Sequence, residues 1–275
     1  MSFEQIVQIL AAPFVVSVFL VGIHCYLGLH VLARGVIFVD LSLAQVAAFG
    51  STLALLFGYE HHSNMGYLIA FCFTLIASFV FAIARRQEKQ FPQEAIIGVT
   101  YAMCSALVIL VVDKMAHGAE HMKDLMVGEV LWVTWADVRK TAIIYGVVGL
   151  LHFIFRKKLI QASFDHENPP APIWDFVFYA LFGLVITSSV HLAGVLQVFA
   201  VLIVPALVCR PFAKSLMARL IFGWVFGVVL TLIGMGLSIK WDMPSGALMV
   251  VCFTVVPILM LIGRAILNLF NNARA

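Results

Sequence analysis

The sequence contains few charged residues for its length. Only 11% of its 275 residues are Asp, Glu, Lys or Arg, and 63% are hydrophobic. Soluble domains average about 25% charged and about 45–50% apolar residues. A net charge of only +3 does not indicate a nucleic-acid-binding surface. The mean hydropathy of +1.05 indicates that most of the chain lies in a membrane.

Paired cysteines and catalytic motifs are also missing. The five cysteines all lie in apolar runs and never occur as C-x-x-C, so neither a disulfide framework nor a thiolate zinc site is indicated. The chain has no G-x-S-x-G elbow, no H-E-x-x-H helix and no P-loop. We therefore expect a chain that is not an enzyme and holds no cofactor, with any ATP hydrolysis on a separate partner.

Long hydrophobic runs dominate the chain. A membrane-spanning helix needs about 20 mostly apolar residues. Runs of this kind occur at 9–32, 36–58, 66–85, 96–113, 140–156, 173–190, 194–210, 217–239 and 245–264. The seventh is interrupted by Pro205 and closely follows the sixth, so it is either a span or a re-entrant piece. The sequence predicts an all-α polytopic membrane protein of eight or nine transmembrane helices in a single domain, 1–275.

Basic residues alternate between the connections of these runs. The connections expected on one face hold twelve of the seventeen basic residues. These are Arg34, Arg85, Arg86, Lys89, Arg156, Lys157, Lys158, Arg210, Lys214, Arg219, Arg264 and Arg274. Basic residues accumulate on the cytoplasmic side of membrane proteins. We therefore expect a multi-pass protein of the bacterial cytoplasmic membrane, with its N-terminus outside and its C-terminus in the cytoplasm.

Ionisable and polar residues lie inside the first two runs, where a central charge costs roughly 2.5–3.5 kcal/mol. Counting from a turn near Arg34 at about 1.5 Å per residue places His30 level with Asp40 and His24 level with Gln45. Imidazole and carboxylate groups are ligands for divalent metals. The pattern predicts two polar layers for a divalent metal in the transport pathway: His30 with Asp40 as a ligand pair, and His24 with Gln45 as a second, weaker resting place or as partners that support the first. The alternative is that the histidines pack between helices and Asp40 caps the second helix.

Further candidate ligands lie in the expected outer segments. His191 and Gln197 bracket Gly194, where unwound backbone would line a pathway, although His191 also suits the headgroup level. His117 and His121 stand four residues apart in the outer loop and would share one face of a helix, as a metal site requires. A solvated polar loop is the alternative for this pair.

Four stretches, in this order, resemble one family. They are the L-x-R-G-V-I-F-V entry to the second run, HGAEHMKDLMVGEVLWVTW outside, SSVHLAGVLQVFAVLIVPALVCRPFAKSL in the centre and LSIKWDMPSGALMVV near the end. They resemble the permease subunits of the zinc, manganese and iron ABC importers, and the likeness extends over almost the whole chain.

The resemblance implies an ABC permease of the metal-chelate type that forms a dimer around a central pathway. It also implies cytoplasmic ATPase subunits that bind ATP, and an extracytoplasmic metal-binding protein that delivers the cargo. Transport would proceed by alternating access. The number of histidines favours zinc, with manganese and iron as alternatives. A permease for a siderophore or cobalamin, and a stand-alone proton-coupled transporter, remain the alternative functions.

The sequence departs from the family at two points. Family members commonly carry an Asp-x-x-Ser-His motif early in the second helix, but Leu41, Ala44 and Gln45 occupy those positions here. Asp40 is offset by one residue, which turns a side chain by about 100° around a helix. The inner segment 164–174 also lacks residues that the family uses for a short ATPase-docking helix, so the resemblance leaves the coupling to an ATPase open.

Overall fold

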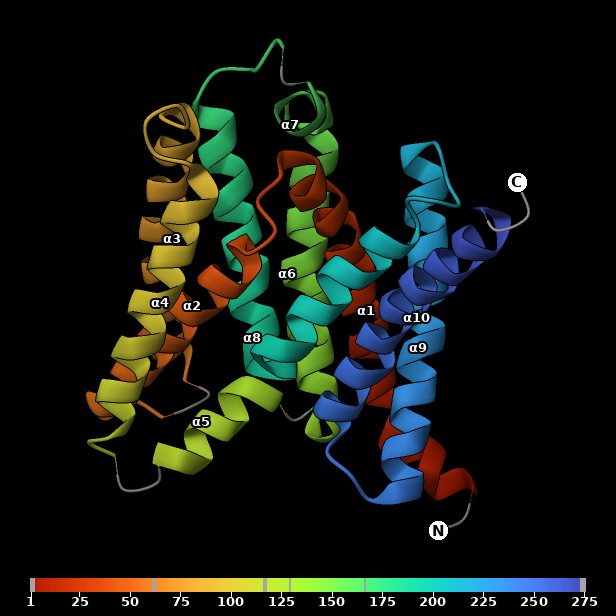
Figure 1. Cartoon of the computed structure of the whole chain (residues 1–275). Coiled ribbons are helices and arrows are strands. Elements are labelled where there is room, and N and C mark those ends of the chain that lie inside the picture. The colour runs from red at the N-terminus through yellow and green to blue at the C-terminus, as the bar shows by residue number, and fades with distance from the viewer. Residues whose placement is uncertain (1–2, 61–62, 116–117, 129, 166, 273–275) are drawn as a thin grey trace.

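The computed structural model describes residues 3–60, 63–115, 118–128, 130–165 and 167–272. Every regular element in these residues is a helix (Figure 1). The helices are α1 (Phe3–Arg34), α2 (Val39–Leu56), α3 (Asn64–Arg86), α4 (Gln93–Val112), α5 (Gly118–Val127), the short 3-10 helix η1 (Val130–Trp132), α6 (Trp135–Ile154), α7 (Arg156–Phe164), α8 (Ile173–Val208), α9 (Leu216–Trp241) and α10 (Ser245–Asn272).

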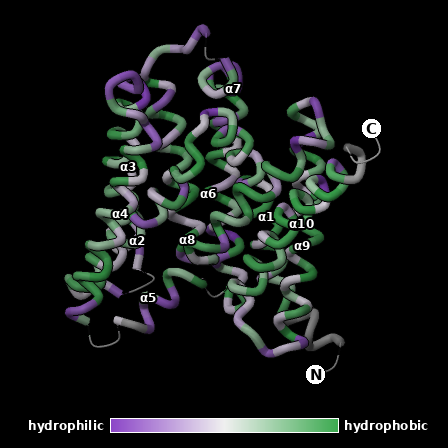
Figure 2. The backbone as a smooth tube through the Cα atoms, viewed as in Figure 1, coloured by the Kyte–Doolittle hydropathy of each residue, from purple (hydrophilic) through white to green (hydrophobic). Residues whose placement is uncertain are grey.

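The helices have the length and hydropathy of membrane spans. Among the described residues, seven helices qualify singly, and α6 with α7 qualifies as an eighth that bends by 81°. Polar residues gather at the two ends of the bundle, at α7 and the α3–α4 turn on one side and at α5 on the other, with apolar residues between (Figure 2). The prediction of an all-α, multi-pass membrane protein is confirmed.

The predicted sixth and seventh runs form one element, α8. Its break lies at Gly194, which has φ 72° and ψ 164°, and not at Pro205, where the helix continues. The two halves run in different directions from this break (Figure 1). Counted as elements, the described residues give eight candidate spans, within the predicted eight or nine. Termini on opposite sides of the membrane, as predicted, require the two halves of α8 to be counted as separate passes.

Glycines allow close backbone contact at the break in α8. Gly194 and Gly128 both have positive φ, a conformation that residues with a Cβ atom rarely adopt. A Cβ atom on Gly128 would overlap the backbone of Ala193, and one on Gly246 would overlap the carbonyl group of Val127. The end of α5 is therefore fixed between the break in α8 and the start of α10.

Placing His30 level with Asp40 assumed that the first two spans pack against each other as a hairpin around the turn near Arg34, and that assumption is wrong. α1 packs mainly against α8, α9 and α6, whereas α2 packs mainly against α4, α3 and α8. Small residues set these pairings, since Gly28 touches the backbone of Leu202 on α8 and Gly50 touches Ala70 on α3. The polar residues of α1 and α2 consequently face different neighbours.

Side-chain caps fix where several helices begin. Ser63 accepts a hydrogen bond from the backbone N–H of Gly66 at the start of α3, and Ser215 caps α9 in the same way. Thr134 and Asp137 form a reciprocal capping box at the start of α6. α6 therefore begins five residues before the predicted boundary at residue 140.

Candidate functional site

Asp40 is a buried carboxylate without a hydrogen-bond partner. It lies in the first turn of α2 and is 1% exposed, and neither of its carboxylate oxygens accepts a hydrogen bond. The backbone N–H groups of Asp40 and Leu41 are near, but their geometry falls short of a hydrogen bond. The N-cap residue of α2 is Phe38, so the alternative that Asp40 caps the helix is wrong. A buried carboxylate with no partner is costly unless a cation or proton neutralises it.

Glu94, in the first turn of α4, is the acidic neighbour of Asp40. Its Oε1 atom accepts a hydrogen bond from the backbone N–H of Phe38 at 3.1 Å, while its buried Oε2 atom has no partner. Glu94 is close enough for its charge to act on Asp40. Sequence analysis missed Glu94 because it precedes the apolar run 96–113. An acidic residue so close to an apolar run was the available signal.

His30 lies away from Asp40, contrary to the prediction. Its Nδ1 atom is 2.8 Å from Ser163 Oγ on α7, and its ring contacts Phe164 and Phe178. The prediction of equal depth assumed that α1 and α2 form a hairpin, which they do not. The structure brings His30 to α7 and α8, and Asp40 to α4.

His24 and Gln45 also do not form the predicted polar layer. The Nδ1 atom of His24 lies 2.8 Å from the carbonyl oxygen of Leu20, one turn earlier on α1, and its ring meets Tyr145 on α6. Its buried Nε2 atom has no hydrogen-bond partner, so it does not bond to Gln45. Gln45 is buried on α2 and 4% exposed.

His152 on α6 joins His30 in the interior, although sequence analysis gave it no role. The ring centroids of the two histidines are 6.3 Å apart, and Nδ1 of His152 lies 3.2 Å from the hydroxyl group of Tyr26. This contact depends on how α1 packs against α6, which no local pattern predicts. Within the described part of a single chain, no three His, Cys, Asp or Glu side chains are grouped as a metal site.

The remaining predicted ligands lie toward the end of the bundle that carries α5. His191 precedes the break in α8, with Nε2 2.7 Å from Ser51 Oγ and Nδ1 2.9 Å from the carbonyl oxygen of Thr187. It lines a cavity of about 470 Å³ whose wall also includes Asp124, Asp137 and Lys140. The predicted break at Gly194, three residues after His191, is present in α8.

Of the predicted pair His117 and His121, the structure describes only His121, which lies on α5, because His117 lies outside the described residues. Nε2 of His121 is 3.3 Å from Thr52 Oγ1. Burial lowers the pKa of His121 from its ordinary value, and the charge of Asp124 acts in the opposite direction. The imidazole therefore favours its neutral form, which is the form that binds metals.

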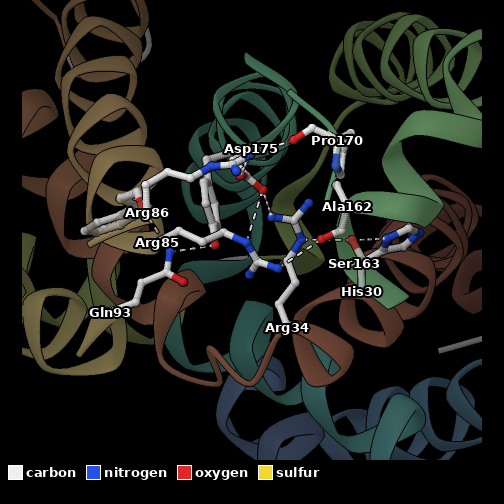
Figure 3. Close-up of polar contacts among 11 residues, drawn as sticks. His30, Arg34, Arg85, Arg86, Gln93, Ala162, Ser163, Pro170 and Asp175 are labelled. Atoms are coloured by element: carbon white, nitrogen blue, oxygen red, sulfur yellow. Dashed lines mark hydrogen bonds and ion pairs between the residues drawn. The ribbon is translucent and has the colours of Figure 1, made fainter. Parts of the chain in front are cut away.

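An ion cluster at the other end of the bundle was missed in the sequence (Figure 3). Asp175, near the start of α8, pairs with Arg34 at 3.0 Å, Arg85 at 3.2 Å and Arg86 at 3.0 Å. The side chain of Arg34 has 0% exposure and that of Asp175 has 3%. These arginines were interpreted as loop charges, but they join α1 and α3 to α8 inside the protein.

The same arginines hold the segment that contains α7. Arg85 donates to the carbonyl oxygen of Ala162 at 3.0 Å, and Arg86 donates to that of Pro170 at 2.8 Å. Arg34 Nε donates to Ser163 Oγ at 2.8 Å, and the same hydroxyl contacts His30 (Figure 3). Both ends of the 165–172 connection are thus tied to the transmembrane helices.

Comparison with known proteins assigns the fold to a family. A model of the ABC 3 transport family matches residues 6–264. The chain belongs to the ABC 3 transport family. The expected resemblance to metal ABC permeases is thereby confirmed at the level of the family.

Relatives of this ABC 3 family chain cover most of its length. An uncharacterised membrane protein of Synechocystis is 23% identical over 272 residues, which is 95% of this chain and 94% of the relative. The manganese transport system membrane protein MntC of Halalkalibacterium halodurans is 24% identical over 253 residues, which is 90% of this chain and 83% of the relative.

A solved structure shares the same fold. The structure described as PsaBC from Streptococcus pneumoniae in complex with Fab matches with a TM-score of 0.76 at 18% identity, covering 92% of this chain and 93% of the matched chain. The helices therefore have the same arrangement as in that solved structure.

Proposed function

We propose that this chain is the permease subunit of an ATP-driven importer for a divalent transition metal. The observation that carries the proposal is the match to the ABC 3 transport family over residues 6–264. The relative named for manganese transport, which covers 90% of this chain, supports a metal as the cargo. Its name favours manganese over the zinc that the histidine count suggested.

The proposed cargo contact within the membrane is Asp40. Asp40 is the one predicted pathway ligand that has a carboxylate group. Both of its carboxylate oxygens are buried and have no hydrogen-bond partner. His30 and His24 each use Nδ1 for contacts within the protein. His191 and His121 lie toward the opposite end, where we propose that cargo enters; His117, outside the described residues, belongs to the same proposal.

The orientation and partners follow from the distribution of charge. We propose that the end with α7 faces the cytoplasm and contacts an ATPase, because α7 begins with Arg156, Lys157 and Lys158. The end with α5 would then face outward and meet a metal-binding protein. A second permease chain would complete the transporter, as the resemblance implies.

Alternating access accounts for the burial of Asp40. Because this carboxylate is 1% exposed, cargo reaches it only in another conformation. The ion cluster around Asp175 joins the α7 segment to α1, α3 and α8, so a movement imposed on α7 by an ATPase would pass to these helices.

Co-purification tests the proposed class of transporter. The tagged chain, extracted from its native membrane in mild detergent, should bring down an ATPase subunit, and metal-dependent growth should require both proteins. Asp40→Asn should abolish that growth while the ATPase still co-purifies. A chain that purifies without an ATPase and takes up metal with a proton gradient alone would be a secondary transporter, contrary to the proposal.

A further inference from the structure

We propose that Asp40 and Glu94 together bind a divalent cation at the point where α2 and α4 begin. The identity of this cation as the cargo rests on the proposed function, but its binding does not. Glu94 takes the place at Asp40 that the sequence had suggested for His30.

The two carboxylates are brought together by helix packing. α2 and α4 pack closely against each other, and each residue lies in the first turn of its helix. Glu94 is also tied to the start of α2, because its Oε1 atom accepts the backbone N–H of Phe38, two residues before Asp40. The relative position of the carboxylates is thus fixed from both helices.

The charge of this pair is not balanced within the described residues. None of the ion pairs found there includes Asp40 or Glu94. The N-termini of α2 and α4 each contribute a partial positive charge of about one half, which together is less than two carboxylates need. Charges buried at membrane depth are costly unless compensated. One divalent cation would neutralise both groups.

The available atoms favour a hard cation. Asp40 offers two buried oxygens and Glu94 offers one, and all three lack hydrogen-bond partners. Oxygen ligands suit manganese and magnesium, whereas zinc commonly takes imidazole or thiolate ligands. His30, the histidine predicted to lie here, is on α1 beside Ser163. We therefore assign the site to an oxygen-preferring cation such as Mn²⁺, with water in its remaining positions.

Binding of Mn²⁺ to the purified full-length chain tests the assignment directly. The variants are Asp40→Asn and Glu94→Gln, which keep the shape of each side chain. Asp113→Asn is the matched control, because its side chain lies at the other end of α4 and is 76% exposed. Titration calorimetry and the Mn²⁺ electron paramagnetic resonance signal should show a site whose affinity falls about tenfold or more in either variant and is unchanged in the control.

Thermal unfolding separates loss of a ligand from loss of the fold. Without metal, both variants should melt at or above the wild-type temperature, because Asp40→Asn removes a buried charge and Glu94→Gln removes the like charge beside it. Mn²⁺ should raise the melting temperature of wild type and of Asp113→Asn, but not that of Asp40→Asn or Glu94→Gln. The proposal would be overturned if both variants bound Mn²⁺ with wild-type affinity. It would also be overturned if the wild-type chain bound no Mn²⁺, because its carboxylates would then be neutralised by protons alone.

Transport measurements distinguish this proposal from the proposed function. If Mn²⁺ binding depends on both carboxylates but the assembled protein moves no metal, the site stands and the transport function fails. If metal uptake depends on ATP while both variants bind Mn²⁺ normally, the function stands and this site is wrong.

Discussion

Replacing Asp175 by Asn should markedly destabilise the protein. The change removes the carboxylate that pairs with three guanidinium groups at 3.0–3.2 Å. Removing one partner of a buried ion pair costs roughly 3–5 kcal/mol. Arg34 has no exposed side-chain surface and remains buried without its anion, whereas the side chain of Arg86 is 33% exposed and can turn to water. We therefore expect a loss of about 3 kcal/mol, at the lower end of this range.

Thermal unfolding in detergent, followed by tryptophan fluorescence, measures this loss. About 3 kcal/mol corresponds to a fall in melting temperature of roughly 6–12 °C for a chain of this size. Arg34→Gln should cost more than Arg86→Gln, in the order of their burial. Asp113→Asn, whose pair with Lys114 is exposed, should stay within about 0.5 kcal/mol of wild type. A melting temperature of Asp175→Asn within a degree of wild type would refute the reasoning.

Three further predictions concern topology, backbone packing and His30. Cysteines introduced at Ser63 and Lys123 of a cysteine-free chain should be labelled from outside intact cells and one at Asn271 should not; the reverse pattern contradicts the orientation. Gly128→Ala should lower stability by at least about 1–2 kcal/mol, because residue 128 has a positive φ and the added Cβ atom would overlap the backbone of Ala193. The control Gly236→Ala, which has open space around it, should not lower stability. If the two variants had equal melting temperatures, the packing at the break would be disproved. His30→Ala should cost about 1–3 kcal/mol of stability, because Ser163 loses one of its two side-chain partners and keeps only Arg34, and it should leave Mn²⁺ affinity unchanged. A folded variant that binds no Mn²⁺ would restore His30 as a pathway ligand.

The spans were predictable because hydropathy is local. Apolar runs of the right length specify a helix wherever the backbone must satisfy its own hydrogen bonds, and the helices appear where these runs predicted them. The break in α8 was also predictable, since Gly194 lies between the polar residues His191 and Gln197 inside an apolar run. The continuation of the helix through Pro205 could not be predicted, because neighbouring helices decide whether a proline ends a membrane helix.

The candidate site was predictable only in part. Asp40 was recognisable as a charge inside an apolar run, but its neighbour depended on whether α2 packs against α1 or against α4. Contacts such as those of Gly28 with Leu202 decide that choice, and they link residues far apart in the sequence. Arg34 and Asp175 were hidden for the same reason, because each looks like an ordinary charge at the end of a span until α1 and α8 are placed together.

Uptake of radioactive manganese into proteoliposomes tests the account most directly. The chain would be reconstituted with the ATPase that co-purifies with it, its metal-binding protein added outside, and ATP supplied in the lumen. We predict uptake that requires ATP and all three proteins and that is lost in Asp40→Asn with assembly intact. Uptake that proceeds without the ATPase, or that is unchanged in Asp40→Asn, would contradict the account.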